Sequence, residues 1–347
     1  MKRTNSMSLR GALPALAVRP GSGAKRRRRA TKQSPRKWGL LARGTLRGRA
    51  VALAMTLVIL ASCAPVDLNA PIYVYDTGVD YNAWVTIPAG PFFHGQETEL
   101  EDIGYDYEIM VTDVTVGQYV GFLMFAMPDG AIKVYGDQVV GFYPGDEFHG
   151  VKHEVRIDPG DYTFIPMNDP TSRITLVGPY SEKEFQINFN YANHPMTNVS
   201  WFGAWGYCAY YGFRLPTELE WEKAARGSAD DRPFPWGYDI ARINANFYAS
   251  RDPFEDMSSF GSRTTPVGFY NGQIYNDYQT LDSASPYGLY DMAGNVWQWV
   301  GDVLPGFSDR FMRGGSKDTY DMDLRIWVRN SATPTYYSPG VGFRCVR

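Results

Sequence analysis

The sequence predicts an α+β fold that is rich in loops. Three segments carry helix-capping signals, and a middle region alternates short β-forming runs with turn residues. Much of the C-terminal part is rich in Gly, Pro, Asn, Asp and aromatic residues but shows no hydrophobic period. The 347 residues, 44% of them hydrophobic, suffice for one large domain or two small ones.

The first 62 residues are expected to be a leader. A basic stretch that includes residues 25–29 precedes the apolar run 51–60, which is shorter than the about 20 residues that span a bilayer. Basic, apolar and small residues in this order are typical of a secretory signal. The run ends in LASC at Cys63, which resembles the lipobox of bacterial lipoproteins. We therefore expect a lipid on Cys63 and a tether over 63–83; a plain signal peptide with an incidental Cys is the alternative.

Export has consequences for location and charge. A lipid on Cys63 would anchor the protein to the cell envelope, and Ala64 after it favours the outer membrane in a Gram-negative host. The leader holds fifteen of the 34 Lys and Arg residues and no acidic residue, so the mature part has 19 basic against 37 acidic side chains. This balance argues against a nucleic-acid partner.

The first elements of the mature chain are strands and a helix. Residues 85–94 predict a strand, a turn and a strand. A helix is expected over 115–126, because Thr115 and Gln118 have the spacing of a capping box and Pro128 stops the helix.

A β-rich insertion is expected at about 129–193. Pro, Gly, Asp and Asn divide it into short β-forming runs, namely AIKVYGDQVVGFY, HEVRI, YTFI, SRITLVG and FQINFNY. The insertion would be either a partner-binding flap or a solvated excursion without a specific role.

Two further helices follow. The first has Ser200 as its N-cap and Gly212 as its stop. The second starts with the capping box of Thr217 and Glu220 and ends at Gly227.

The cysteines and histidines offer little catalytic chemistry. After Cys63 only Cys208 and Cys345 remain, which in an oxidising compartment form one disulfide most simply, or else two buried thiols or a reactive one. The four histidines show no zinc-ligand spacing. The sequence has no GxSxG, phosphate-binding loop, HExxH or GxGxxG motif.

Several segments from about residue 84 to the C-terminus together resemble the formylglycine-generating-enzyme, or sulfatase-modifying-factor, family. They are HPMTNVSW, GYCAYYGFRLPTELEWEKAARG, PWG, TPVGFY, YGLYDMAGNVWQW, RGGS and GFRC. The resemblance implies a C-type-lectin-like α+β domain over 84–347, interrupted by the insertion, and a disulfide between Cys208 and Cys345. It also implies core roles for Trp221, Trp297 and Trp299, and loop-anchoring roles for Arg214, Arg226, Arg313 and Arg344.

The family's catalytic chemistry is not matched. Members that make formylglycine use two closely spaced cysteines between the RGGS and GFRC motifs, where a thiolate pair binds Cu(I). In this chain the corresponding residues 317–341 contain no Cys. We therefore assign no catalytic residue and expect no copper. Relatives that use non-haem iron take histidines from a helical domain, and no His pair with that spacing occurs here.

The resemblance also implies two calcium sites in loops. One would use Asp291, Gln298 and the carbonyls of Gly294 and Val296. The other would use Asn246, the Phe247 carbonyl and Asp256. Loops supply the carboxylate and carbonyl oxygens that Ca²⁺ requires. Gln298 replaces a family Glu, which removes a formal charge, and Asx turns without an ion are the alternative.

These observations favour a non-catalytic binding or structural lipoprotein of the envelope. Its partner would be an envelope protein or glycan, contacted through the aromatic residues Tyr320, Trp327, Tyr336 and Tyr337. The alternatives are a protein-modifying oxidase of the formylglycine-generating type and another metal-dependent oxidoreductase.

Overall fold

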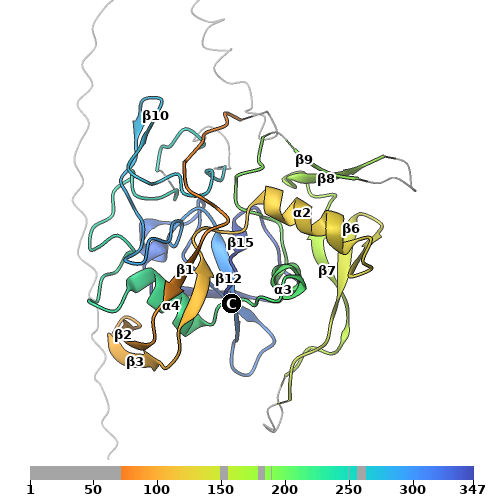
Figure 1. The fold of residues 1–347 in the computed structure, drawn as a ribbon, viewed down its shortest axis with the longest axis horizontal. Helices are drawn as coiled ribbons and strands as arrows, with labels where there is room; N and C mark the ends of the chain where they lie inside the picture. The colour runs from red at the N-terminus through yellow and green to blue at the C-terminus, as the bar shows by residue number, and fades with distance from the viewer. Residues whose placement is uncertain (1–71, 149–154, 179–183, 189, 249, 256–262) are drawn as a thin grey trace, which may run out of the picture. The chain divides into compact units, whose positions relative to one another are not determined.

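Figure 1 shows the computed structural model, which describes residues 72–347 except 149–154, 179–183, 189, 249 and 256–262. The leader, Cys63 and Asp256 lie outside the described residues, so the structure says nothing of the predictions made for them. Within the described residues, no helix has the length and apolar character needed to cross a membrane.

All three predicted helices are present with their predicted caps. α2 (Val116–Ala126) follows Thr115, whose side chain accepts from the Gln118 N–H in a complete capping box. α3 (Trp201–Tyr210) begins after Ser200, which accepts from the Gly203 N–H. α4 (Glu218–Arg226) has its own capping box and ends at Gly227, whose φ is +81°. Glycine is suited to that position because a side chain disfavours a left-handed backbone.

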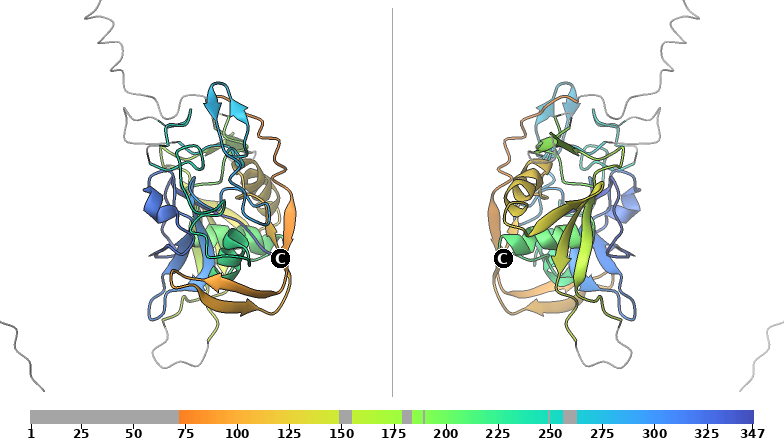
Figure 2. Two further views of the ribbon diagram at one scale, coloured as in Figure 1. Left: turned by 90° about the vertical axis from the view of Figure 1, so that its left-hand side faces the viewer. Right: turned by 90° about the vertical axis from the view of Figure 1, so that its right-hand side faces the viewer.

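Short strands surround these helices. β1 (Trp84–Ile87) pairs with β4 (Tyr107–Met110), and β2 (Gly90–His94) pairs with β3 (Glu99–Ile103). The main sheet has the order β14-β13-β12-β15, with bounds Arg329–Ala332, Arg310–Arg313, Trp297–Val303 and Val341–Phe343. β15 runs parallel to β12, and the other pairs are antiparallel. A small hairpin of β10 (Ile274–Tyr275) and β11 (Tyr278–Gln279) lies far from β2 and β3 in both views of Figure 2.

The predicted β-rich region contains five strands. β5 (Ile132–Tyr135), β6 (Gln138–Tyr143) and β7 (Gly160–Pro166) form one sheet, and β8 (Ile174–Val177) pairs with β9 (Glu184–Ile187). The HEVRI run forms no strand in its described residues 155–157. Instead, Ile157 exchanges hydrogen bonds of 3.0 Å with the backbone and side chain of Asp146, which satisfies its backbone outside a sheet.

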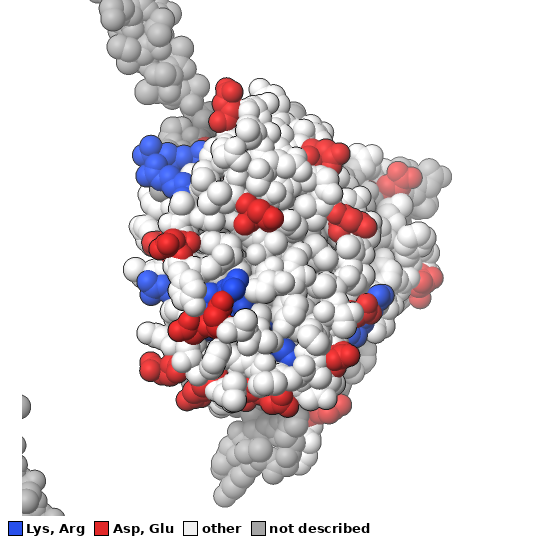
Figure 3. Space-filling view, turned by 60° about the vertical axis from the view of Figure 1, so that its left-hand side comes forward, with Lys and Arg blue, Asp and Glu red and all other residues white. Residues whose placement is uncertain are grey.

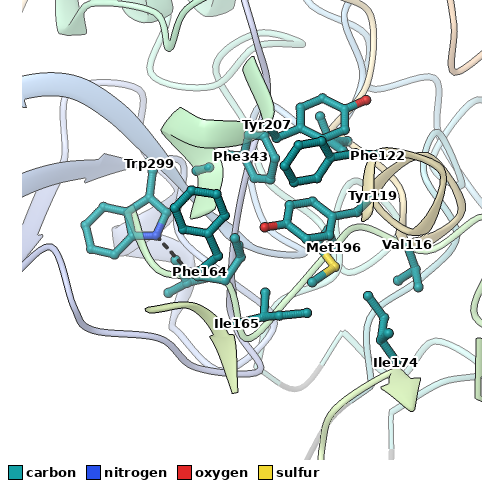
Figure 4. Close-up of a cluster of buried hydrophobic side chains, with 14 of the residues drawn as sticks. Val116, Tyr119, Phe122, Phe164, Ile165, Ile174, Met196, Tyr207, Trp299 and Phe343 are labelled. Carbon is teal, nitrogen blue, oxygen red and sulfur yellow. Dashed lines mark hydrogen bonds between the residues drawn. The ribbon is translucent and has the colours of Figure 1, made fainter. Parts of the chain in front are cut away.

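This region contributes to the main hydrophobic core. Phe164 and Ile165 of β7 are at most 2% exposed. Figure 4 shows Phe164 next to Trp299, in one cluster with Ile165, Tyr119, Tyr207 and Phe343. The Tyr162 ring stacks on Phe202 of α3 at 4.0 Å between centroids. The packing therefore goes beyond that of a solvated excursion.

On the face of the molecule in Figure 3, the charged groups are dispersed. Acidic side chains are scattered among uncharged ones on this face, and basic side chains do not form a continuous patch.

Candidate functional site

A pocket of about 360 Å³ opens beside the segment 317–341. Its walls come from the start of β12, from β13 and β14, from the turn after the RGGS motif and from the loop before β15. Most of the lining side chains carry a hydroxyl, amide or carboxylate group. The lining residues are Trp297, Met312, Ser316, Asp318, Thr319, Asn330, Ser331, Ala332, Tyr336, Ser338, Gly340 and Val341.

Backbone hydrogen bonds hold the loop between β14 and β15 in place. They connect three points of the loop to segments far away in the sequence. The donors and acceptors are Trp201 N–H to Pro334 O (3.1 Å), Asn198 N–H to Ser338 O (3.0 Å) and Trp297 N–H to Gly340 O (2.8 Å). This wall of the pocket is therefore preorganised.

Another part of the wall is a closed turn. The Ser316 N–H donates to Thr319 Oγ1 at 2.9 Å, and the Thr319 N–H donates back to Ser316 O at 3.0 Å. The Lys317 N–H and the Thr319 carbonyl connect the turn to Asn295 and Tyr248. The turn thus holds the side chain of Asp318 at the pocket.

Asp318 is half-exposed and forms an ion pair with buried Lys317. Lys317 Nζ lies 2.5 Å from Asp318 Oδ2, and the two side chains are 5% and 47% exposed. Burial lowers the pKa of Lys317, which the carboxylate opposes. The ion pair has no net charge, so the pocket presents a carboxylate oxygen whose charge is balanced by Lys317.

The four aromatic residues that the sequence predicts as partner contacts lie in different surroundings. Tyr336 lines the pocket and is 44% exposed. Tyr320 and Tyr337 are exposed but are not among the lining residues, and Tyr320 packs against Tyr248 at 5.1 Å. The Trp327 ring lies below the guanidinium of Arg226 at 5.5 Å, in a structural contact.

The structure joins Cys208 to Cys345, with a Cα–Cα distance of 5.8 Å. Both residues are fully buried. The described residues therefore contain no free thiol. The pocket offers oxygen and nitrogen atoms and the lone thioether of Met312, which do not match the thiolate pair that Cu(I) needs.

At the first predicted calcium site, the side chain of Gln298 is engaged by protein groups. Gln298 Oε1 accepts from Trp221 Nε1 at 2.8 Å and from Arg344 Nε at 2.9 Å, so both of its lone pairs are used. Its Nε2 donates to Asp291 O at 2.6 Å. The Arg344 guanidinium thus lies beside Gln298, whose side-chain oxygen has no lone pair left for an ion in this geometry. Gly294 and Val296 remain in the same turn, where the Val296 N–H donates to Gly294 O at 2.8 Å.

The second predicted calcium site retains a suitable oxygen. Asn246 Oδ1 is buried without a hydrogen-bond partner, whereas its Nδ2 donates to Arg263 O at 2.9 Å. The Phe247 carbonyl accepts from the Ser250 N–H. A buried oxygen without a donor is costly unless a cation or water binds it, so Asn246 fits a calcium ligand.

The loop-anchoring arginines and core tryptophans are confirmed. Each of the four arginines donates to at least one carboxylate and one carbonyl or amide oxygen, as predicted; the residues are Arg214, Arg226, Arg313 and Arg344. The tryptophans Trp221, Trp297 and Trp299 are at most 7% exposed. The lining residues Asn330, Ser331 and Ser338 were not found from the sequence, since isolated polar residues in a loop carry no distinguishing pattern.

Comparison with known proteins gives partial matches to curated relatives. The inactive Cα-formylglycine-generating enzyme 2 of Bos taurus is 37% identical over 159 residues, which is 44% of this chain and 49% of the relative. The formylglycine-generating enzyme of Streptomyces coelicolor is 35% identical over 176 residues, 44% of this chain and 52% of that protein. The serine/threonine-protein kinase pkn1 of Chlamydia caviae is 35% identical over 180 residues, which is 46% of this chain and 25% of that protein. The chain thus spans about half or less of these relatives.

Solved structures and a family model also match. PvdO from Pseudomonas aeruginosa shares 21% identity and a TM-score of 0.49, with 80% of this chain and 98% of that one covered. The model of the sulfatase-modifying factor enzyme 1-like domain matches residues 75–347. This match confirms the expected α+β, C-type-lectin-like, loop-rich fold class. The chain therefore belongs to the sulfatase-modifying factor enzyme 1-like domain family.

Proposed function

We propose that this protein is a non-catalytic binding or structural lipoprotein of the cell envelope that uses the pocket beside residues 317–341 to hold a partner. The observation that carries the proposal is the chemistry of the pocket wall. Where the family resemblance implies a thiolate pair, the wall presents hydroxyl, amide and carboxylate groups. Such groups bind a polar ligand but do not replace two soft sulfur ligands.

The remaining cysteines do not supply the missing pair. Cys208 and Cys345 are bonded to each other in the interior, and Cys63 precedes the folded domain. Opening the disulfide would release two thiols that are fully buried and are not among the lining residues of the pocket. The family also includes a relative named as inactive, so a member without the oxidase reaction has a precedent.

The location is proposed on sequence grounds. A signal that ends at Cys63 would export the protein, and acyl chains on this residue would hold it at the envelope, in the outer membrane if the host is Gram-negative. The buried disulfide supports an oxidising compartment, where such bonds persist.

We propose calcium only at the second loop site. Asn246 Oδ1 and the Phe247 carbonyl would supply oxygens there, with Asp256 as the acidic ligand. The ion would stabilise the loop and would take no part in a reaction, since neither Asn246 nor Phe247 is among the residues that line the pocket.

A metal analysis tests the proposal. The full chain, expressed in a bacterial host and purified in detergent, should contain calcium but no stoichiometric copper or iron. Asn246→Ala should reduce the calcium content, whereas Asn276→Ala, an exposed Asn on the β10–β11 turn, should leave it unchanged. Stoichiometric copper or iron would contradict the proposal and favour an oxidoreductase.

A further inference from the structure

We infer that the pocket beside β14 recognises a neutral carbohydrate through its hydroxyl groups, an assignment that rests on the proposed binding function. Its volume of about 360 Å³ lies at the lower end of the range for small-ligand sites, which suits one or two sugar rings. The groups that face the pocket, their spare hydrogen-bonding capacity and their net charge all point to this ligand class.

Several lining side chains have unused hydrogen-bonding capacity. Within the described part of the chain, no hydrogen bond engages Asp318 Oδ1, Asn330 Nδ2, Ser331 Oγ or the Tyr336 hydroxyl. These atoms comprise acceptors, donors and hydroxyls that act as both. A ligand with several neighbouring hydroxyl groups, each both donor and acceptor, complements such a set.

The pocket also has apolar surfaces. Trp297 and Met312 lie among its lining residues, together with Tyr336, a residue that is 44% exposed. Sugar rings combine hydroxyl edges with C–H faces, and the C–H faces pack on aromatic rings. The mixture of polar and aromatic groups therefore suits a carbohydrate better than a wholly apolar ligand.

Charge discriminates further between ligands. The only charged side chain that lines the pocket among the described residues is Asp318, and its own partner Lys317 neutralises it from behind. An anionic ligand would meet a carboxylate and find no lining cation. A neutral sugar, in contrast, would donate a hydroxyl to the free Asp318 oxygen without separating the ion pair.

The pocket wall has no room for a side chain at Gly340. A Cβ atom added to Gly340 would lie 3.1 Å from Asp318 Oδ2 and 3.4 Å from Ser316 Oγ. A side chain at Gly340 would therefore crowd the Asp318 oxygen that pairs with Lys317 and shift the carboxylate. Because the loop is held by three backbone hydrogen bonds, little ordering free energy would be lost on binding.

The test uses the full chain in detergent on a panel of immobilised oligosaccharides that are neutral, amino-bearing or acidic. Binding should be confined to neutral members, and titration calorimetry should then give the affinity for the best of them. Tyr336→Ala and Gly340→Ala should each weaken that affinity about tenfold or more. The matched control Tyr135→Ala removes a tyrosine that is 79% exposed on β5 and should leave the affinity unchanged.

The inference would be overturned by no binding to any neutral oligosaccharide, by preferential binding to acidic ones, or by unchanged affinity in both pocket variants. Binding of a peptide that competes at the pocket would also contradict it. These outcomes differ from a failure of the proposed function, which would appear as oxidation of a thiol peptide by the same preparation.

Discussion

Phe164 provides a sharp test of whether the β-rich region belongs to the core. Its side chain is 2% exposed, and its ring lies between two glycines from different elements. A Cβ added to Gly141 would lie 2.3 Å from the nearest atom of the Phe164 ring, and one added to Gly206 would lie 2.4 Å from it. The ring of β7 therefore packs directly on the backbone of β6 and of α3.

Phe164→Ala should lower the free energy of unfolding by about 3–5 kcal/mol, the usual cost of emptying a buried aromatic site. The control Phe142→Ala changes a residue of the adjacent strand that is 57% exposed and should alter stability by about 0.5 kcal/mol or less. Urea unfolding followed by tryptophan fluorescence measures both variants, with the slope m unchanged.

A further substitution, in helix α3, makes the test stricter. Gly206→Ala should destabilise the wild type, because the added methyl overlaps the Phe164 ring. In the Phe164→Ala background the overlap is gone, and Ala should stabilise α3 by about 0.5–1 kcal/mol through its helix propensity. Equal effects in the two backgrounds, or a Phe164→Ala effect no larger than that of the control, would refute the packing account.

Three further predictions concern other parts of the chain. Replacing both Cys208 and Cys345 by Ala should lower the free energy of unfolding by about 2–5 kcal/mol, because the bond closes a loop of 137 residues; an unchanged urea midpoint under oxidising conditions would contradict this. Burial raises the pKa of Asp113 to about 8, and the charge of Arg344 opposes this shift only in part. Between about pH 5 and 8 the folded state therefore holds a proton that the unfolded state has released, so the free energy of unfolding should fall as the pH rises through this range. Asp113→Asn should flatten this slope in pH-dependent urea unfolding, and an unchanged slope would show that Asp113 is not the cause. Cys63→Ser should move the protein from the membrane fraction to the soluble fraction, whereas a wild type that is already soluble and carries no lipid would rule out the anchor.

Local signals explain why the helices were predictable from the sequence. The capping boxes of α2 and α4 are complete within four residues, so no distant contact is needed to specify them. The HEVRI run was not predictable in the same way. The run has the composition of a strand, but the backbone N–H of Ile157 donates to the Asp146 carboxylate instead of to another strand.

The candidate site could be predicted only in outline. The sequence indicated the segment after the RGGS motif and its missing cysteines, but the pocket depends on bonds between distant residues, such as Asn198 to Ser338. The role of Gln298 could not be predicted from the sequence for the same reason. Its role is decided by Trp221 and Arg344, which lie 77 and 46 residues away in the sequence.

The proposed function requires that this family member does not oxidise a substrate cysteine. The most direct measurement incubates the full chain with copper, oxygen and a sulfatase-type cysteine peptide and follows the peptide by mass spectrometry. The Streptomyces coelicolor formylglycine-generating enzyme serves as the positive control on the same peptide. We expect an unchanged peptide mass, because the described residues offer no free thiol. Conversion of the cysteine to an aldehyde above a control without enzyme would contradict it.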